Sequence, residues 1–151
     1  MIPARAVALA VLMATATTLA QGGRAAWTTP TIAEVDAIDP DVEALYIDLH
    51  RNPELAFEET ETAAKLAARV KALGFEVTTG VGRTGIVAVL ENGPGPTVML
   101  RTELDALPVE EKTGLPFAST VMVKNANGQS TPVMHVCGHD LHMAAWAARP
   151  A

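Results

Sequence analysis

The sequence predicts an α/β fold that carries a metal site. Two stretches in the first half repeat apolar residues at helical spacing, and short β-branched runs separated by glycine and proline follow them. A His-Val-Cys-Gly-His-Asp-Leu-His segment then occupies residues 135–142. With 151 residues, 49% of them hydrophobic and 19% charged, the chain has the balance of one ordinary globular domain.

Residues 1–26 are expected to be a signal peptide. Arg5 supplies a positive start, and residues 6–20 form an apolar run that is short for a membrane span. Several small residues between positions 20 and 26 suit cleavage, so the cleavage position stays open, and an uncleaved membrane anchor is the alternative. We therefore expect a secreted or periplasmic protein whose folded part is residues 27–151, without stable membrane association after cleavage.

The first helix is predicted to begin at Asp39 and Pro40, because aspartate caps helices well and proline is tolerated at the first helical position. Apolar residues recur at three- and four-residue spacing as far as Leu49. The pattern ends near Asn52 and Pro53, where proline disfavours continuation.

The second helix is predicted over residues 59–73. Its apolar residues share one face, acidic residues crowd its first turn, and Gly74 stands where a helix commonly ends in glycine.

Strands are predicted at residues 75–79, 85–90 and 97–100, with glycine- and proline-rich turns between them. The glycines of the first turn do not match a dinucleotide-binding pattern and are interpreted as turn residues. Residues 118–134 are expected to form a loop or a wide hairpin that leads into the Cys/His segment.

The net charge of −6 and the aromatic content of 4% argue against a nucleic-acid partner. No basic stripe with interleaved aromatic residues is present in the sequence, so neither phosphate contacts nor base stacking is supported.

Cys137 is the only cysteine of the chain, and three of the four histidines lie within five residues of it. In an oxidising compartment it is a free thiol, an intermolecular disulfide partner or a metal ligand. Thiolate and imidazole are the pair that zinc and similar ions favour, so ligation is the preferred interpretation over a buried cysteine. A structural zinc module is a weaker alternative, because these ligands are too crowded for the usual two-and-two spacing.

Acidic residues follow the third predicted strand, at positions 103, 105, 110 and 111. Carboxylates at the end of a buried strand lie where open α/β sheets build their sites, although composition alone also allows a polar strand end.

Taken together, four segments resemble the metal-dependent amidohydrolase and exopeptidase family that contains aminoacylase-like enzymes, hippurate hydrolase and auxin-conjugate hydrolases. They are residues 49–59, 84–86, 101–108 and 135–142, in that order. The resemblance implies a partial zinc-exopeptidase-like catalytic domain, with a mixed sheet, flanking helices and a truncated end. Two divalent ions, zinc, manganese or cobalt, would serve the complete enzyme, and a homodimer is possible in the full-length form.

The resemblance also assigns roles to individual residues. Cys137 and His139 match positions that bind the metal pair, and Asp105 matches the acid that orients a metal-bound histidine. The other polar residues of the last segment are expected to make hydrogen bonds around the ligands before ligating directly: His135, Asp140 and His142. The histidine of the Leu-His-Arg-Asn-Pro stretch, His50, is expected to be structural.

The implied chemistry is hydrolysis of an N-acyl amino acid or a small peptide amide by metal-activated water. In that family the general base is a glutamate of a Glu-Glu pair downstream of the last segment. No such pair follows residue 142 in this sequence. Glu110 and Glu111 precede the segment, so the base role is not transferred to them. The alternative is therefore a noncatalytic fragment with residual metal binding.

Two departures from the family pattern bear on these expectations. Thr102 and Glu103 stand where the family usually has alanine and aspartate. After His142 the family continues as an apolar helix, whereas here Pro150 follows within eight residues. The sequence is therefore expected to be an N-terminal fragment of a longer enzyme.

Overall fold

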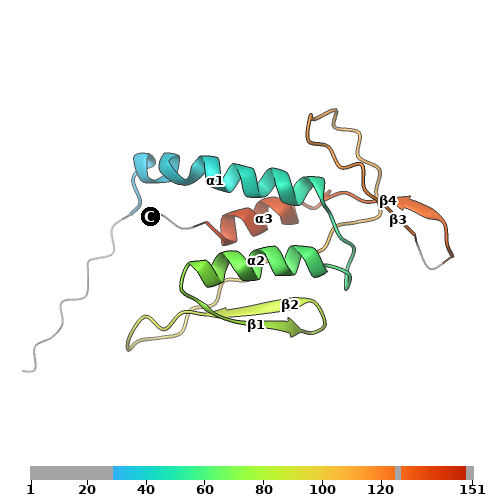
Figure 1. Cartoon of the computed structure of the whole chain (residues 1–151). Coiled ribbons are helices and arrows are strands. Elements are labelled where there is room, and N and C mark those ends of the chain that lie inside the picture. Colours follow the sequence, from blue (N-terminus) through green and yellow to red (C-terminus); the bar gives the residue numbers. More distant parts are fainter. Residues whose placement is uncertain (1–28, 125–126, 149–151) are drawn as a thin grey trace, which may run out of the picture.

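The computed structural model describes residues 29–124 and 127–148, so the expected signal peptide lies outside the described residues. The described part contains three helices: α1 (Ile32–Arg51), α2 (Thr60–Ala72) and α3 (His139–Trp146). The short α3 lies between α1 and α2, although it comes last in the sequence (Figure 1). None of these helices combines the length and apolar character needed to cross a membrane.

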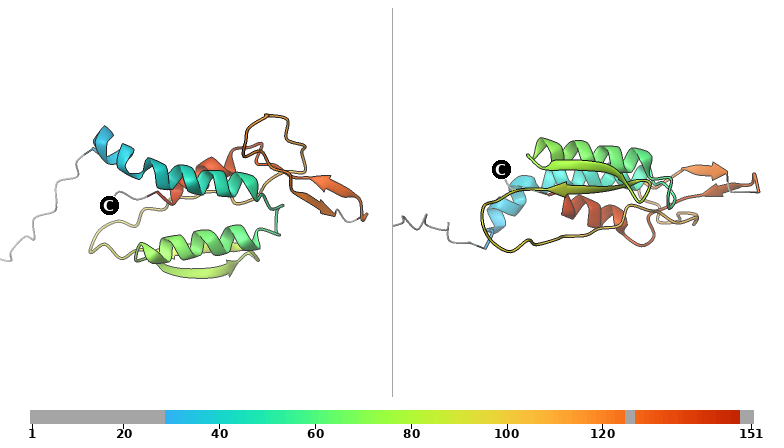
Figure 2. Two further views of the ribbon diagram at one scale, coloured as in Figure 1. Left: turned by 45° about the horizontal axis from the view of Figure 1, so that its top comes forward. Right: turned by 90° about the horizontal axis from the view of Figure 1, so that it is seen from below.

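The described strands form two antiparallel hairpins, which together with the helices confirm the α/β class. β1 (Glu76–Val81) pairs with β2 (Gly85–Val89), and this hairpin packs on α2. β3 (Met122–Lys124) pairs with β4 (Ser130–Pro132) within the segment that was expected to be a loop or a wide hairpin. The second hairpin projects beyond the helices in both views of Figure 2.

The predicted start of the first helix is wrong, because α1 begins at Ile32 and passes through Pro40. Thr31 and Glu34 form a capping box: the Thr31 side chain accepts from the Glu34 N–H, and the Glu34 carboxylate accepts from the Thr31 N–H. This cap satisfies amides that the helix itself leaves unpaired, so the helix starts upstream of the proline. The predicted end is confirmed, since α1 stops at Arg51.

The second helix is confirmed to within one residue at each end. Gly74 follows it with a φ of 90°, a left-handed conformation that glycine adopts without steric cost.

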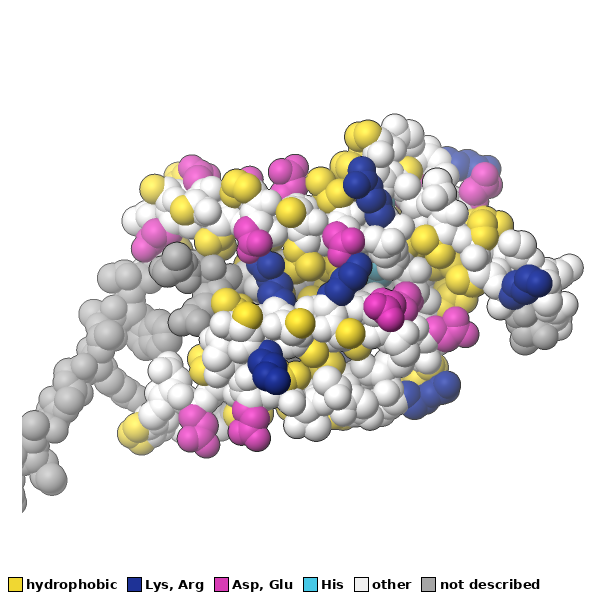
Figure 3. Space-filling model, in the orientation of Figure 1, with side chains coloured by type: hydrophobic (Ala, Val, Ile, Leu, Met, Phe, Trp, Pro, Cys, Tyr) yellow, Lys and Arg dark blue, Asp and Glu magenta, His cyan; other side chains and the backbone are white. Residues whose placement is uncertain are grey.

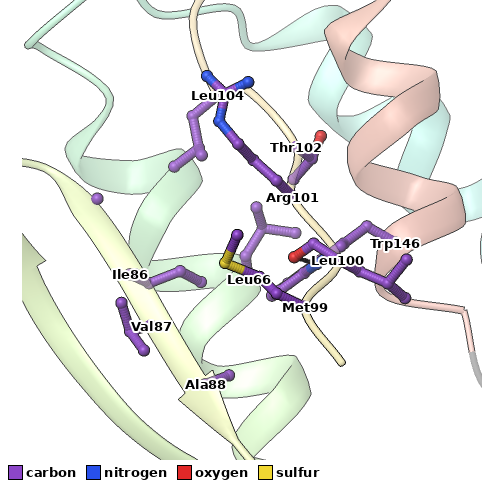
Figure 4. Close-up of a pocket in the computed structure, with 11 residues that line it drawn as sticks. Leu66, Ile86, Val87, Ala88, Met99, Leu100, Arg101, Thr102, Leu104 and Trp146 are labelled. Atoms are coloured by element: carbon purple, nitrogen blue, oxygen red, sulfur yellow. Dashed lines mark hydrogen bonds between the residues drawn. The ribbon is translucent and has the colours of Figure 1, made fainter. Parts of the chain in front are cut away.

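The third predicted strand is wrong. Residues 97–100 have no strand pairing among the described residues, and Val98, Met99 and Leu100 are 83%, 83% and 78% exposed. A pocket of about 320 Å³ lies between β2 and this segment, with Ile86 and Met99 on its lining (Figure 4). A β-branched run becomes a strand only when another backbone pairs with it, and local sequence does not supply that partner.

The core joins the three helices. Leu49 from α1, Leu66 from α2, and Met143 and Ala147 at α3 contact one another, and each is at most 1% exposed. Burying these apolar side chains fixes α3 against both longer helices, with hydrophobic burial as the main driving force. The last helix of the described chain, which carries the second half of the Cys/His segment, is therefore held by the first two.

Ion pairs link the outer surfaces of α1 and α2. Lys65 Nζ lies 2.6 Å from Asp48 Oδ2, and the Arg69 guanidinium pairs with Asp41. The Arg69 Nε–H also donates to the Ala147 carbonyl at the end of α3, at 3.1 Å. Figure 3 shows acidic and basic side chains interspersed over the two helices on this face.

Candidate metal centre

Two backbone hydrogen bonds between Leu107 and Met134 bring Asp105 to the Cys/His segment. The Leu107 N–H donates to the Met134 carbonyl at 3.0 Å, and the Met134 N–H donates to the Leu107 carbonyl at 3.1 Å. On the other side, the Ala106 N–H donates to the Glu54 carbonyl at 2.7 Å. Asp105 is thus held beside the metal-ligand candidates although they are far apart in sequence.

Gly138 turns the chain between the two ligand candidates. Its φ of 76° lies in the left-handed region, and it is the residue from which α3 starts at His139. A Cβ at this position would meet no atom within 4 Å, so the requirement for glycine is conformational. The turn leaves Cys137 outside the helix and His139 at its first position.

Asp105 contacts His139 through both its backbone carbonyl and its carboxylate. The His139 Nδ1–H donates to the Asp105 carbonyl at 2.8 Å, and Nδ1 lies 3.2 Å from Asp105 Oδ1. A carbonyl oxygen only accepts, so Nδ1 carries a proton, and in the neutral form of the ring the lone pair is then at Nε2. This is the arrangement in which a histidine ligates a metal while its other nitrogen is held by a protein oxygen.

Cys137 is exposed and its thiol is free. A thiolate and an imidazole with an available lone pair suit zinc and related divalent ions, so this donor set fits the metals that the resemblance implies. The described residues contain no group of three or more His, Cys, Asp or Glu side chains arranged to hold a metal. Cys137 and His139 therefore provide part of a ligand set, and the roles of these residues stay predictions.

The two other histidines of the segment differ sharply. His142 is exposed, with its ring centroid 6.1 Å from that of His139. His135 is 5% exposed, and neither of its ring nitrogens has a hydrogen-bond partner. Burial lowers the pKa of His135 and outweighs the negative charge of Asp140, which raises it.

His50 joins two carboxylates, and one of them, Asp140, follows the candidate ligand His139 in the chain. Its Nδ1 lies 2.6 Å from Asp140 Oδ2, and its Nε2 lies 3.0 Å from Glu111 Oε1. Their side chains are 6% exposed for His50, 0% for Glu111 and 3% for Asp140. When both carboxylates are ionised they only accept, so both ring nitrogens then donate and the ring is an imidazolium.

Electrostatics favour this charged arrangement. Burial by itself lowers the pKa of His50, but the hydrogen bonds to Glu111 and Asp140 and their negative charges outweigh it and raise the pKa above its ordinary value. Burial opposes ionisation of Glu111 too, yet hydrogen bonds from Thr113, His50 and Ser119 lower its pKa.

Glu111 is a residue whose importance the sequence does not reveal. The sequence offers it only as a possible general base, whereas in the structure its carboxylate also accepts from the Ser119 N–H at 2.6 Å and from the Thr113 hydroxyl. Its neighbour Glu110 is exposed and pairs with Lys112 at 3.0 Å. No local pattern distinguishes the two glutamates, since the partner of Glu111 on α1 is 61 residues away.

Comparisons with known proteins identify relatives of this chain. No family model matches the chain. The hippurate hydrolase of Campylobacter jejuni is 40% identical over 112 residues, which are 74% of this chain and 27% of that protein. The N-acetyl-L-cysteine deacetylase of Bacillus subtilis is 42% identical over 98 residues, 64% of this chain and 21% of that protein.

A solved structure is also similar. A dinuclear metal-binding peptidase of the M20 family from Bacillus subtilis has 34% sequence identity and a TM-score of 0.63, covering 74% of this chain and 29% of that one. The chain spans about a quarter of the length of the curated relatives it matches.

The α/β fold and its similarity to a solved dinuclear metal-binding peptidase place the matched residues in the class of metal-dependent hydrolases. Within that class, the relatives show that its matched residues belong to the amidohydrolase and M20 peptidase family. The family resemblance that the four sequence segments indicated is confirmed.

Proposed function

We propose that Cys137 and His139 are ligands of a two-metal centre in an exported amidohydrolase that acts on N-acyl amino acids or small peptide amides. The observation that carries the proposal is the 2.8 Å contact between His139 Nδ1 and the Asp105 carbonyl, which favours the tautomer with Nε2 as a metal donor. The relatives named hippurate hydrolase and N-acetyl-L-cysteine deacetylase support the substrate class. Export rests on residues 1–26 alone and remains a prediction, as does a homodimer.

The chain's own residues would hold the metal and set its surroundings. Divalent ions such as zinc, manganese or cobalt, when bound, polarise the amide carbonyl and lower the pKa of a bound water. Cys137 would bind as the thiolate, and Asp105 would keep His139 in the ligating tautomer. We assign the general base to no described residue, because Glu111 is occupied by His50 and Glu110 lies at the surface with Lys112.

A noncatalytic metal-binding role is the second candidate. It is favoured by one observation: the described residues contain no group of three or more potential ligands arranged around one point. In that case Cys137 and His139 would bind a single ion weakly, and the chain would hydrolyse no amide.

Metal binding by the 151-residue chain tests both candidates. We expect Co²⁺ to produce a thiolate-to-cobalt absorption band that Cys137→Ser abolishes and His139→Gln weakens. The matched control is Glu110→Gln, which removes one exposed carboxylate and leaves the segment intact. Absence of the band in the unaltered chain refutes both candidates.

Hydrolysis separates the two candidates. The Co²⁺- or Zn²⁺-loaded chain is assayed with hippurate and with N-acetyl amino acids, and Cys137→Ser serves as the control. Metal-dependent turnover that disappears in Cys137→Ser supports the amidohydrolase in this chain itself. Metal binding without turnover supports the noncatalytic role.

A further inference from the structure

We infer that His50 is a positioning residue for the candidate metal centre, because it ties the first turn of α3 to α1 and to the 111–119 segment. The inference rests on the proposed function, since α3 begins with the proposed ligand His139. It assigns to His50 a role more specific than the structural one expected from the sequence.

The contacts of His50 span three distant parts of the chain. His50 is near the end of α1, Glu111 is 61 residues downstream and Asp140 is 90 residues downstream. All three side chains are more than nine-tenths buried. A buried carboxylate is costly unless a cation or hydrogen-bond donors compensate it, and His50 supplies one such contact to each of the two acids.

The remaining oxygens of both acids have local donors. Asp140 Oδ1 accepts from the Leu141 N–H at 2.9 Å, and Glu111 Oε2 accepts from the Ser119 N–H. His50 is the long-range contact that both carboxylates share. Imidazolium is well suited to this position, because it presents two N–H donors on opposite sides of a small rigid ring.

Aromatic packing restricts the orientation of the ring. The His50 centroid lies 5.6 Å from that of Tyr46 and 5.4 Å from that of Phe117, the latter at an interplanar angle of 82°. Edge-to-face packing at such distances is favourable, and it holds the two N–H groups toward their acceptors.

The position of Asp140 determines the position of His139. The two residues are adjacent in the first turn of α3, and no side chain caps that turn at Gly138. The first turn is therefore held from one side by His50 through Asp140 and from the other by Asp105 through His139. Loss of the contact between His50 and Asp140 would let the turn move, and this would weaken the contact between Asp105 and His139.

The first test measures Co²⁺ affinity and the visible cobalt spectrum of His50→Gln. Gln has a similar reach but cannot donate to two acids on opposite sides. We expect affinity to fall about tenfold or more, the usual consequence of losing a group that orients a ligand, and the cobalt bands to change. The matched control is Lys65→Met, which breaks another interhelical ion pair that does not contact α3 and should leave affinity within about twofold.

A second variant covers the case in which His50→Gln does not fold. Asp140→Asn keeps the shape of the side chain and removes its charge, and we expect a similar loss of Co²⁺ affinity. If both single variants fold, the double variant should lose no more than the more affected single variant, because both remove the same contact. Additive losses, or unchanged affinity and spectrum in a folded variant, overturn the inference.

A metal-free measurement separates this inference from the proposed function. Nitrogen-15 NMR of the His139 ring should show the Nδ1–H tautomer in the unaltered chain and a mixture of tautomers in His50→Gln. An unchanged tautomer overturns the positioning role whether or not the chain binds metal. If the tautomer changes but the unaltered chain binds no Co²⁺, the positioning role stands and the metal function fails.

Discussion

Replacing Asp105 by alanine tests how the candidate ligand His139 is oriented. Loss of a group that orients a metal ligand commonly weakens metal binding by about 10- to 100-fold. Here the carboxylate is only one of two contacts, since Nδ1 is 3.2 Å from Asp105 Oδ1 and 2.8 Å from the backbone carbonyl of the same residue. The carbonyl survives the substitution, so we expect the lower end of that range, about tenfold or about 1.4 kcal/mol.

The assay is competition for Zn²⁺ between the chain and a chromophoric chelator, with far-ultraviolet circular dichroism to verify the fold. Glu110→Ala is the control, because it removes an exposed carboxylate of the same neighbourhood in sequence. A loss above about 100-fold in a folded Asp105→Ala would show that the carboxylate ligates directly or that the carbonyl does not hold the ring. A change below about twofold would show that neither the carboxylate nor its charge matters, and either result refutes the reasoning.

Three further predictions concern stability and are measured by urea unfolding. Gly138→Ala should destabilise the chain by about 1–2 kcal/mol, because alanine resists a φ of 76°, and an unchanged midpoint would contradict this. Leu66→Ala should cost about 3 kcal/mol because the side chain is 0% exposed in the helical core, whereas the exposed Leu141→Ala should cost far less. The pair of His50 and Glu111 should stabilise most between about pH 4.5 and 6.5, their ordinary pKa values. Because the pKa of His50 is raised, its contribution to stability is full below pH 6.5 and is lost as pH rises through the raised pKa. Because the pKa of Glu111 is lowered, its contribution is full above pH 4.5 and is lost as pH falls through the lowered pKa. A pH profile unchanged in His50→Gln would contradict this.

The helices show which part of the fold sequence reading could recover. The second helix was predicted to within one residue at each end, because its apolar face and its terminal Gly74 are local signals. The start of the first was misplaced at Pro40, although the Thr-x-x-Glu pattern at Thr31 and Glu34 was available in the sequence as a capping signal. The start of α1 and the bounds of α2 both depend on interactions between residues a few positions apart, which a sequence can show.

Residue type and spacing pointed to a metal site in residues 135–142, and the resemblance selected Cys137, His139 and Asp105 within and beside it. The structure places Asp105 against His139, while the ligand roles stay predictions. The partnership of Glu111 with His50 was missed, because an acid between an exposed glutamate and a lysine carries no local sign that it is buried.

By itself, the sequence determined the helix periods, the turn glycines and the concentration of metal-type ligands in residues 135–142, because these depend on neighbours along the chain. Tertiary structure decided which polar groups meet. Packing of Leu49, Leu66 and Met143 sets α3 between the two longer helices, and this places His50 against Asp140 across 90 residues of sequence. It also decided that residues 97–100 pair with no described strand, since a strand depends on a second backbone that its own sequence does not specify.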